Sequence, residues 1–104
     1  LGMYRYYQLY PEYELNKGFA DFFFKPSPSV PVLPPFTYLL EVKYAKAGAS
    51  EKEIRILADE ARAQLLRYSE DELVAEARTK GELKLITIVW RSWELALLEE
   101  VTLS

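Results

Sequence analysis

The segment TYLLEVKYAK, residues 37–46, has the pattern of a β-strand in the middle of a sheet. Side chains alternate between the two faces of a strand. One face carries Leu39, Glu41 and Lys43, and the other is apolar throughout: Tyr38, Leu40, Val42 and Tyr44. Because the strand is apolar over most of its length and has apolar residues on both faces, we expect a central strand that is covered on both sides. The charges of Glu41 and Lys43 inside this strand need an explanation.

Two further strands are expected before this segment. Residues 4–15 are rich in tyrosine, which favours strands, and Pro11 must lie at a sheet edge or a bulge. A turn signal, Asn-Lys-Gly at residues 16–18, leads into an aromatic strand at residues 19–25, so the two strands should form a hairpin. Residues 26–35 hold five of the six prolines and are expected to form an extended loop.

Helices are expected after the central strand. Ser50 and Glu53 match a capping box, and apolar residues at helical spacing predict a helix over residues 50–68: Ile54, Leu57, Ala61, Leu65 and Tyr68. A shorter helix should follow, capped by Ser69 or Asp71 and ending at Gly81. Residues 83–90 predict a strand, whereas residues 93–101 are compatible with either a strand or a helix. This order predicts an α/β fold in one domain, residues 1–104.

The composition excludes several classes of site. The chain has no cysteine and no histidine, which excludes disulfides, thiolate metal sites, the usual zinc ligand and the commonest general base. A net charge of −3 argues against a domain that holds nucleic acid by charge alone. No apolar run approaches the roughly 20 residues of a membrane span, so we expect a soluble, cytoplasmic protein.

Three charges interrupt the apolar strands. Asp21 lies within the aromatic strand, and Glu41 and Lys43 are about 6.6 Å apart along the central strand. Burying such charges is costly unless they are paired or bind an ion. One explanation is a structural ion pair of Lys43 with Glu41 or Asp21. The other is a site for Mg²⁺, which takes carboxylate ligands, with the lysine orienting a water molecule.

The stretches GFADFFF, residues 18–24, and LLEVKY, residues 39–44, resemble the PD-(D/E)XK nuclease superfamily. Its motif is an aspartate on one strand and E-x-K on the next. More narrowly, the chain resembles the nuclease-like C-terminal domain of AAA-ATPase-like proteins, whose signature also includes a glutamate before a glycine. Here Glu12 precedes Gly18, and residues 64–68, QLLRY, match the Q-x-x-x-Y of RecB-like members. The resemblance spans residues 12–90.

This resemblance implies a restriction-endonuclease-like α/β fold, with a mixed central sheet and a crossover helix. It implies phosphodiester hydrolysis of nucleic acid, DNA in the first place, with Mg²⁺ or Mn²⁺ as cofactor. The implied catalytic residues are Asp21, Glu41, Lys43 and Gln64. The implied metal ligands are Asp21, Glu41, the backbone carbonyl of Val42, and Glu12 as an outer or second-metal ligand. Glu14 lies on the same strand face as Glu12 and is the alternative to it.

The chain departs from the family pattern in two places. Phe19 stands where the family usually has arginine, and nothing before Tyr4 can supply the helix with which the superfamily begins. We therefore expect a C-terminal fragment of a longer protein, with an AAA-ATPase-like domain upstream. The sheet face left uncovered predicts a homodimer, with exchange of the first strands as one way to form it. The alternative function is an inactive nuclease-like fold that serves as a docking or oligomerisation module.

Overall fold

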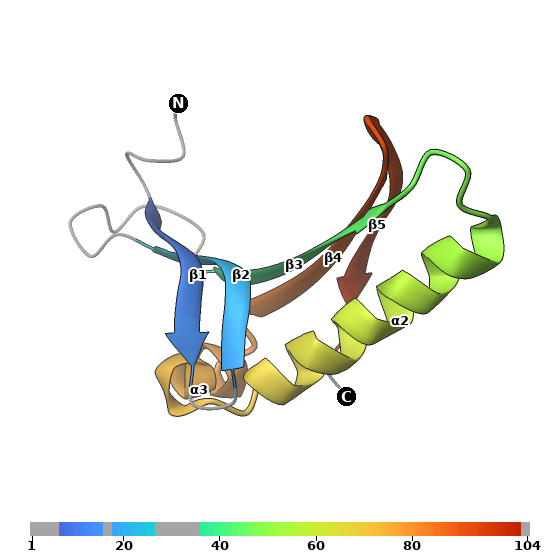
Figure 1. Ribbon diagram of the computed structural model, residues 1–104. Helices are drawn as coiled ribbons and strands as arrows, with labels where there is room; N and C mark the ends of the chain where they lie inside the picture. The colour runs from blue at the N-terminus through green and yellow to red at the C-terminus, as the bar shows by residue number, and fades with distance from the viewer. Residues whose placement is uncertain (1–6, 16–17, 27–35, 103–104) are drawn as a thin grey trace.

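The computed structural model of the chain describes residues 7–15, 18–26 and 36–102, and Figure 1 shows one sheet with helices against it. The predicted turn at residues 16–17 and the loop at residues 27–35 lie outside the described residues. The sheet has five strands in the order β1-β2-β3-β4-β5. Their bounds are Tyr7–Leu15 for β1, Gly18–Pro26 for β2, Thr37–Ala45 for β3, Leu83–Arg91 for β4 and Glu94–Val101 for β5.

The sheet is mixed, as the sequence predicts. β1 and β2 form an antiparallel hairpin, β2 and β3 are antiparallel, β3 and β4 are parallel, and β4 and β5 are antiparallel. β3 is the central strand, and the edge strand β1 carries Pro11, where a missing N–H is tolerated. The C-terminal segment is a strand and not a helix, because it forms an antiparallel pair with β4. The turn between the two strands contains Ser92, which has φ 54°.

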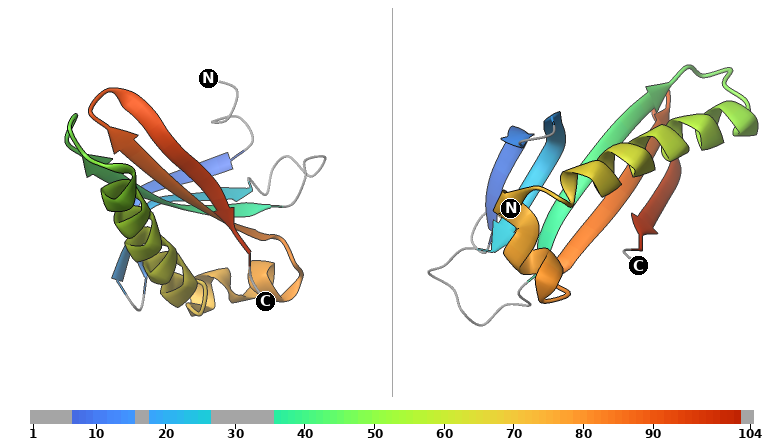
Figure 2. Two further views of the ribbon diagram at one scale, coloured as in Figure 1. Left: turned by 90° about the vertical axis from the view of Figure 1, so that its right-hand side faces the viewer. Right: turned by 90° about the horizontal axis from the view of Figure 1, so that it is seen from below.

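The parallel pair β3–β4 is connected by two helices, α2 (Glu51–Tyr68) and α3 (Glu72–Thr79). The N-cap of α2 is as predicted: the Ser50 hydroxyl accepts a hydrogen bond from the backbone N–H of Glu53 at 3.1 Å. The buried face of α2 contains Ala58 in addition to the predicted stripe, whereas Leu57 is only partly buried. This crossover places α2 across the sheet, as the two views of Figure 2 show.

Both described helices cover the same face of the sheet. Side chains of α2 and α3 pack with β3 and β4 in one cluster, and a second cluster lies near the start of α2. The first consists of Leu39, Leu65, Tyr68, Val74, Leu83, Leu85 and Val101. On β3 the residues of this inner face are Thr37, Leu39, Glu41 and Lys43. None of the described helices is long and apolar enough to cross a membrane.

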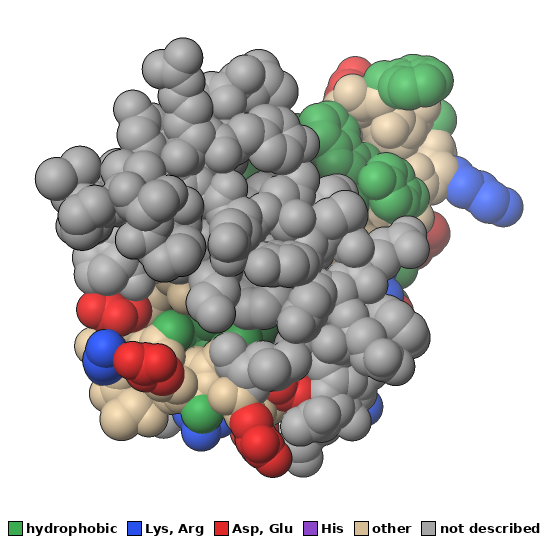
Figure 3. All heavy atoms as spheres, turned by 90° about the vertical axis from the view of Figure 1, so that its left-hand side faces the viewer, with side chains coloured by type: hydrophobic (Ala, Val, Ile, Leu, Met, Phe, Trp, Pro, Cys, Tyr) green, Lys and Arg blue, Asp and Glu red, His purple; other side chains and the backbone are tan. Residues whose placement is uncertain are grey.

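The opposite face, which we call the open face, has no helix of the described chain against it (Figures 1 and 2). Its residues include Tyr44, which is 75% exposed, and Leu95 and Leu98, which are about half exposed. Trp93, at the turn between β4 and β5, is 94% exposed. Figure 3 shows exposed hydrophobic side chains grouped at the upper right of the view, with others at the lower left. The expected uncovered face is therefore present among the described residues.

Candidate functional site

The sheet register brings residues from three strands into one row. Phe22 of β2 pairs with Leu40 of β3, so the next position along places Asp21 level with Glu41. In the parallel pair, Glu41 is the partner of Thr87 on β4. Residues opposite each other on neighbouring strands share a face, so all three side chains belong to the inner face that α2 covers.

The register of the hairpin extends this row to β1. Pro11 pairs with Phe22 and Tyr13 pairs with Ala20, which places Glu12 level with Asp21. Glu14 pairs with Phe19 and is therefore two residues further toward the hairpin turn. The side chains of Glu12 and Glu14 lie outside the described part of the structure. The backbone register favours Glu12 over Glu14 as the fourth member of the row.

Asp21 and Glu41 are linked by hydrogen bonds between a side chain of one strand and the backbone of the other. The Asp21 carboxylate accepts a hydrogen bond from the backbone N–H of Val42 at 2.8 Å. In return, a hydrogen bond from the Asp21 backbone to the Glu41 carboxylate lowers the pKa of Glu41. The last backbone-paired residues of β2 and β3 are Phe22 and Leu40. The hydrogen bonds of Asp21 come directly after them, so side chains hold the two strands together where the backbone pairing ends.

The carboxyl group of Glu41 is buried and incompletely paired. Glu41 is 5% exposed, and its Oε1 has no hydrogen-bond partner within the described part of the chain. Burial, followed by the negative charge of Asp21, raises the pKa of Glu41 from 4.5 to about 7, although Lys43 opposes this shift. A carboxyl group that titrates near neutral pH in a buried position is typical of a functional site.

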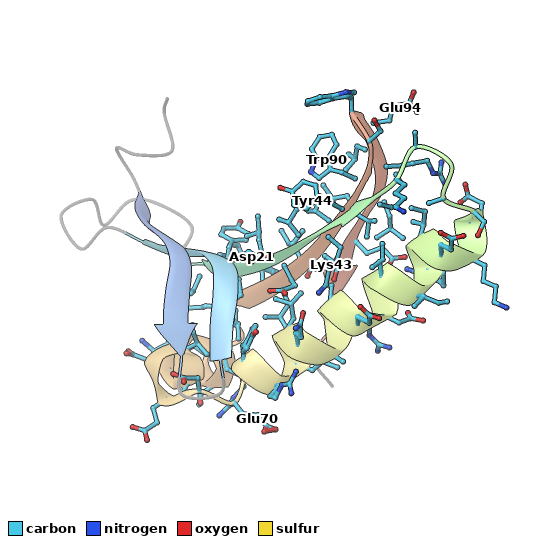
Figure 4. All side chains as sticks on the ribbon, in the orientation of Figure 1. Asp21, Lys43, Tyr44, Glu70, Trp90 and Glu94 are labelled. Atoms are coloured by element: carbon cyan, nitrogen blue, oxygen red, sulfur yellow. The ribbon has the colours of Figure 1, made fainter. Side chains whose placement is uncertain are left out.

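Lys43 lies one inner-face position beyond Glu41 on β3. Figure 4 shows Asp21 and Lys43 on the side of the sheet that faces α2, with Tyr44 and Trp90 on the other side. In the described part of the chain, neither Asp21 nor Glu41 forms an ion pair with Lys43. The explanation of these charges as a structural ion pair therefore lacks the contact it requires.

α2, which packs on this face of the sheet, carries Gln64 and Tyr68. Gln64 is half-buried, and its Oε1 has no hydrogen-bond partner among the described residues. Burial raises the pKa of Tyr68, and the charge of Glu41 raises it further, so this side chain lies within electrostatic range of Glu41. Buried oxygens without a hydrogen-bond partner among the described residues thus occur on α2 as well as on β3 and β4. Buried polar atoms without partners are rare in native proteins.

One residue of the row was missed by sequence reasoning. Thr87 is fully buried, and its Oγ1 also lacks a hydrogen-bond partner in the described structure. A signal was available in LKLITIVW, residues 83–90, because alternation along β4 places Thr87 between the buried Leu85 and Val89. It is a polar interruption of an apolar face, the same feature that drew attention to Asp21 and Glu41.

Comparison with known protein families agrees with this arrangement. A model of the PD-(D/E)XK nuclease superfamily matches residues 1–100. The chain belongs to this superfamily. Neither the curated proteins nor the solved structures gave a significant match. The mixed five-stranded sheet with its helical crossover is consistent with the restriction-endonuclease-like fold, and membership suggests a nuclease that acts on nucleic acid.

PD-(D/E)XK nucleases generally use divalent metal ions, and the donor set of this chain fits such an ion. Among the described residues no three histidine, cysteine, aspartate or glutamate side chains lie close enough together to hold a metal ion, but Asp21 and Glu41 supply two ligands. Mg²⁺ is commonly held by one or two carboxylates, with water and phosphate oxygens completing its octahedron. The unpaired Oε1 of Glu41 is an available oxygen ligand.

Proposed function

We propose that this domain is a Mg²⁺-dependent nuclease that hydrolyses phosphodiester bonds, with DNA as the first substrate to test. The observation that carries the proposal is the pair of carboxylates on neighbouring strands, Asp21 and Glu41, with Lys43, whose amine forms no ion pair with a described residue, within electrostatic range of Glu41. Membership of the PD-(D/E)XK superfamily supports it. A lysine that had only to balance these carboxylates would form an ion pair with one of them.

In this proposal Asp21 and Glu41 hold the metal ion, with the backbone carbonyl of Val42 as the third protein ligand. The hydrogen bond from the Val42 N–H to Asp21 supports this set, because it joins the two ligand segments. Glu12, level with Asp21 in the sheet, is proposed as an outer or second-metal ligand. When bound, the metal ion polarises the scissile phosphate and lowers the pKa of a coordinated water molecule. Mn²⁺ can take the place of Mg²⁺.

Hydrolysis adds a water oxygen to phosphorus and breaks the bond from phosphorus to a sugar oxygen, which leaves with a proton. Lys43 is proposed to orient the attacking water and to offset the negative charge that develops on the phosphate oxygens. Gln64, on α2, is proposed to accept a hydrogen bond from the same water, because its Oε1 is buried and has no hydrogen-bond partner among the described residues. Because the net charge is −3, affinity for nucleic acid should depend on the metal ion more than on a basic surface.

The test is metal-dependent cleavage by the full chain. Supercoiled plasmid and labelled DNA and RNA oligonucleotides are incubated with Mg²⁺ or Mn²⁺, with a chelator as the control. We expect strand cleavage that requires the metal ion and stops when the chelator is added. A wild-type protein that binds metal but cleaves none of these substrates would contradict the nuclease proposal.

A second candidate function is a docking or oligomerisation module that retains the nuclease fold. The open face favours it, because Tyr44, Leu98 and Trp93 expose large apolar side chains there and at the adjacent turn. Phe19 also favours this function, because it replaces the arginine that is usual in the family that the chain resembles, and an arginine would contact phosphate. The proposed partner is a second copy of this chain, which would give a homodimer, or an AAA-ATPase-like domain upstream in the same protein. Equal heats of Mn²⁺ binding by wild type and Asp21→Ala would favour this function.

A further inference from the structure

Packing alone does not explain why a threonine occupies position 87. Thr87 is 0% exposed on β4 and lies between the fully buried Leu85 and Val89 on the inner face. A valine would suit such a buried apolar position. Valine has nearly the same shape as threonine but lacks the hydroxyl. Burying a hydroxyl without a hydrogen bond is unfavourable, and Oγ1 of Thr87 has no partner in the described structure.

The neighbour of Thr87 is Glu41. The two residues are register partners on adjacent parallel strands and face the same side, so their Cα atoms are about 4.8 Å apart. Within the described residues the Glu41 Oε1 has no donor and the Thr87 hydroxyl has no acceptor, so the two groups are adjacent but not hydrogen-bonded to each other in this structure. A small change in the side-chain torsions of Glu41 would bring its carboxylate within hydrogen-bond distance of the Thr87 hydroxyl, and hydrogen bonds from hydroxyls to carboxylates are among the stronger ones.

We propose that Thr87 is a positioning residue of this site, whose hydroxyl donates a hydrogen bond to the Glu41 carboxylate and orients it toward the metal ion. The inference rests on the proposed metal-dependent function and adds a neutral residue to the proposed site of Asp21, Glu41 and Lys43. Carboxylates that ligate metals are themselves held by hydrogen bonds, and loss of such a partner typically weakens metal binding about 10- to 100-fold. The hydroxyl is therefore retained for the metal-bound state, at a cost to the metal-free fold.

The test compares Thr87→Val, which removes only the hydroxyl, with Thr87→Ser, which retains it. Thr37→Val is the matched control, because Thr37 is buried on the same face of β3, about 13 Å along the strand from Glu41. Mn²⁺ affinity is measured by calorimetry on the full chain, and the midpoint of thermal unfolding is measured without metal.

We expect Thr87→Val to bind Mn²⁺ at least 10-fold more weakly while its metal-free midpoint stays equal or rises. Thr87→Ser should retain wild-type affinity although it loses a buried methyl group, and Thr37→Val should bind Mn²⁺ as the wild type does. Unchanged affinity in Thr87→Val, or equal losses in Thr87→Val and Thr87→Ser, would overturn this inference alone. A wild-type chain that binds no Mn²⁺ would overturn both the inference and the proposed nuclease function.

Discussion

The carboxylate of Asp21 on β2 accepts a hydrogen bond from the backbone N–H of Val42 on β3, with 2.8 Å between Oδ2 and N. This hydrogen bond lies immediately beyond the last residue pair of the β2–β3 ladder, so a side chain takes the place of a backbone acceptor. It also holds Asp21 beside the backbone of the residue that follows Glu41. Asp21 consequently has two tasks, one in joining the strands and one as a proposed metal ligand, and substitutions can separate them.

Asp21→Asn should lose metal binding but keep most of its stability, because an amide oxygen still accepts the Val42 N–H. Asp21→Ala should lose both, and removal of a hydrogen bond to a charged group predicts a loss of about 2 kcal/mol in the free energy of unfolding. Urea denaturation and Mn²⁺ calorimetry measure the two effects. Equal stability of the two variants would show that the bond to Val42 contributes little.

Lys43→Ala should abolish cleavage and leave metal binding nearly intact. The amine is proposed to act on developing charge, and loss of one such group typically lowers kcat by about 10²-fold or more. Lys46→Ala, an exposed lysine just past the end of β3, is the control and should cleave as the wild type does. If Lys43→Ala cleaves at the wild-type rate, the role assigned to Lys43 is wrong.

Metal affinity should depend on pH through Glu41. Its pKa is raised to about 7, and the metal ion must displace the proton to use this carboxylate. Below pH 7 the apparent dissociation constant for Mn²⁺ should therefore increase about tenfold per pH unit, and above pH 8 it should be nearly constant. Calorimetry between pH 5.5 and about 8.5 measures this. A flat profile across that range would mean that Glu41 does not ligate the ion.

The stability of the metal-free protein should depend on pH in the opposite sense. The native state keeps the Glu41 proton up to about pH 7, whereas the unfolded state releases it near 4.5. The stabilising contribution of this proton is complete below pH 4.5 and is lost as pH rises through 7, on the order of 3 kcal/mol in total. Glu41→Gln should lack this part of the pH dependence. Denaturation of both proteins at pH values from about 4 to 8 makes the comparison.

Self-association should depend on the open face. Leu98→Lys places a charge among the exposed apolar side chains of β5 and should weaken dimerisation without lowering the unfolding midpoint, because Leu98 is 58% exposed. Ala63→Lys, at an exposed position on α2, is the control on the covered side. Light scattering at high micromolar concentration reports the oligomeric state. A monomeric wild type under these conditions would contradict the dimer prediction.

Much of the fold could be predicted because its signals are local. The capping box at Ser50 and Glu53 begins α2, and the alternation along residues 37–46 assigns β3 and its inner face. The sequence of residues 93–101 is compatible with either a strand or a helix, since its leucine, alanine and glutamate content suits both. Its pairing with β4 decides for the strand, which is a tertiary effect that local propensity does not contain.

The sequence by itself determined which residue types interrupt the apolar strands, and on which face of β3 Glu41 and Lys43 lie, because side-chain direction has a period of two along any strand. Only the tertiary structure decided which of these residues meet. The registers of three strand pairs place Glu12 rather than Glu14 level with Asp21 and bring Thr87 beside Glu41. Register depends on the sum of contacts between segments far apart in the chain, so no local pattern records it.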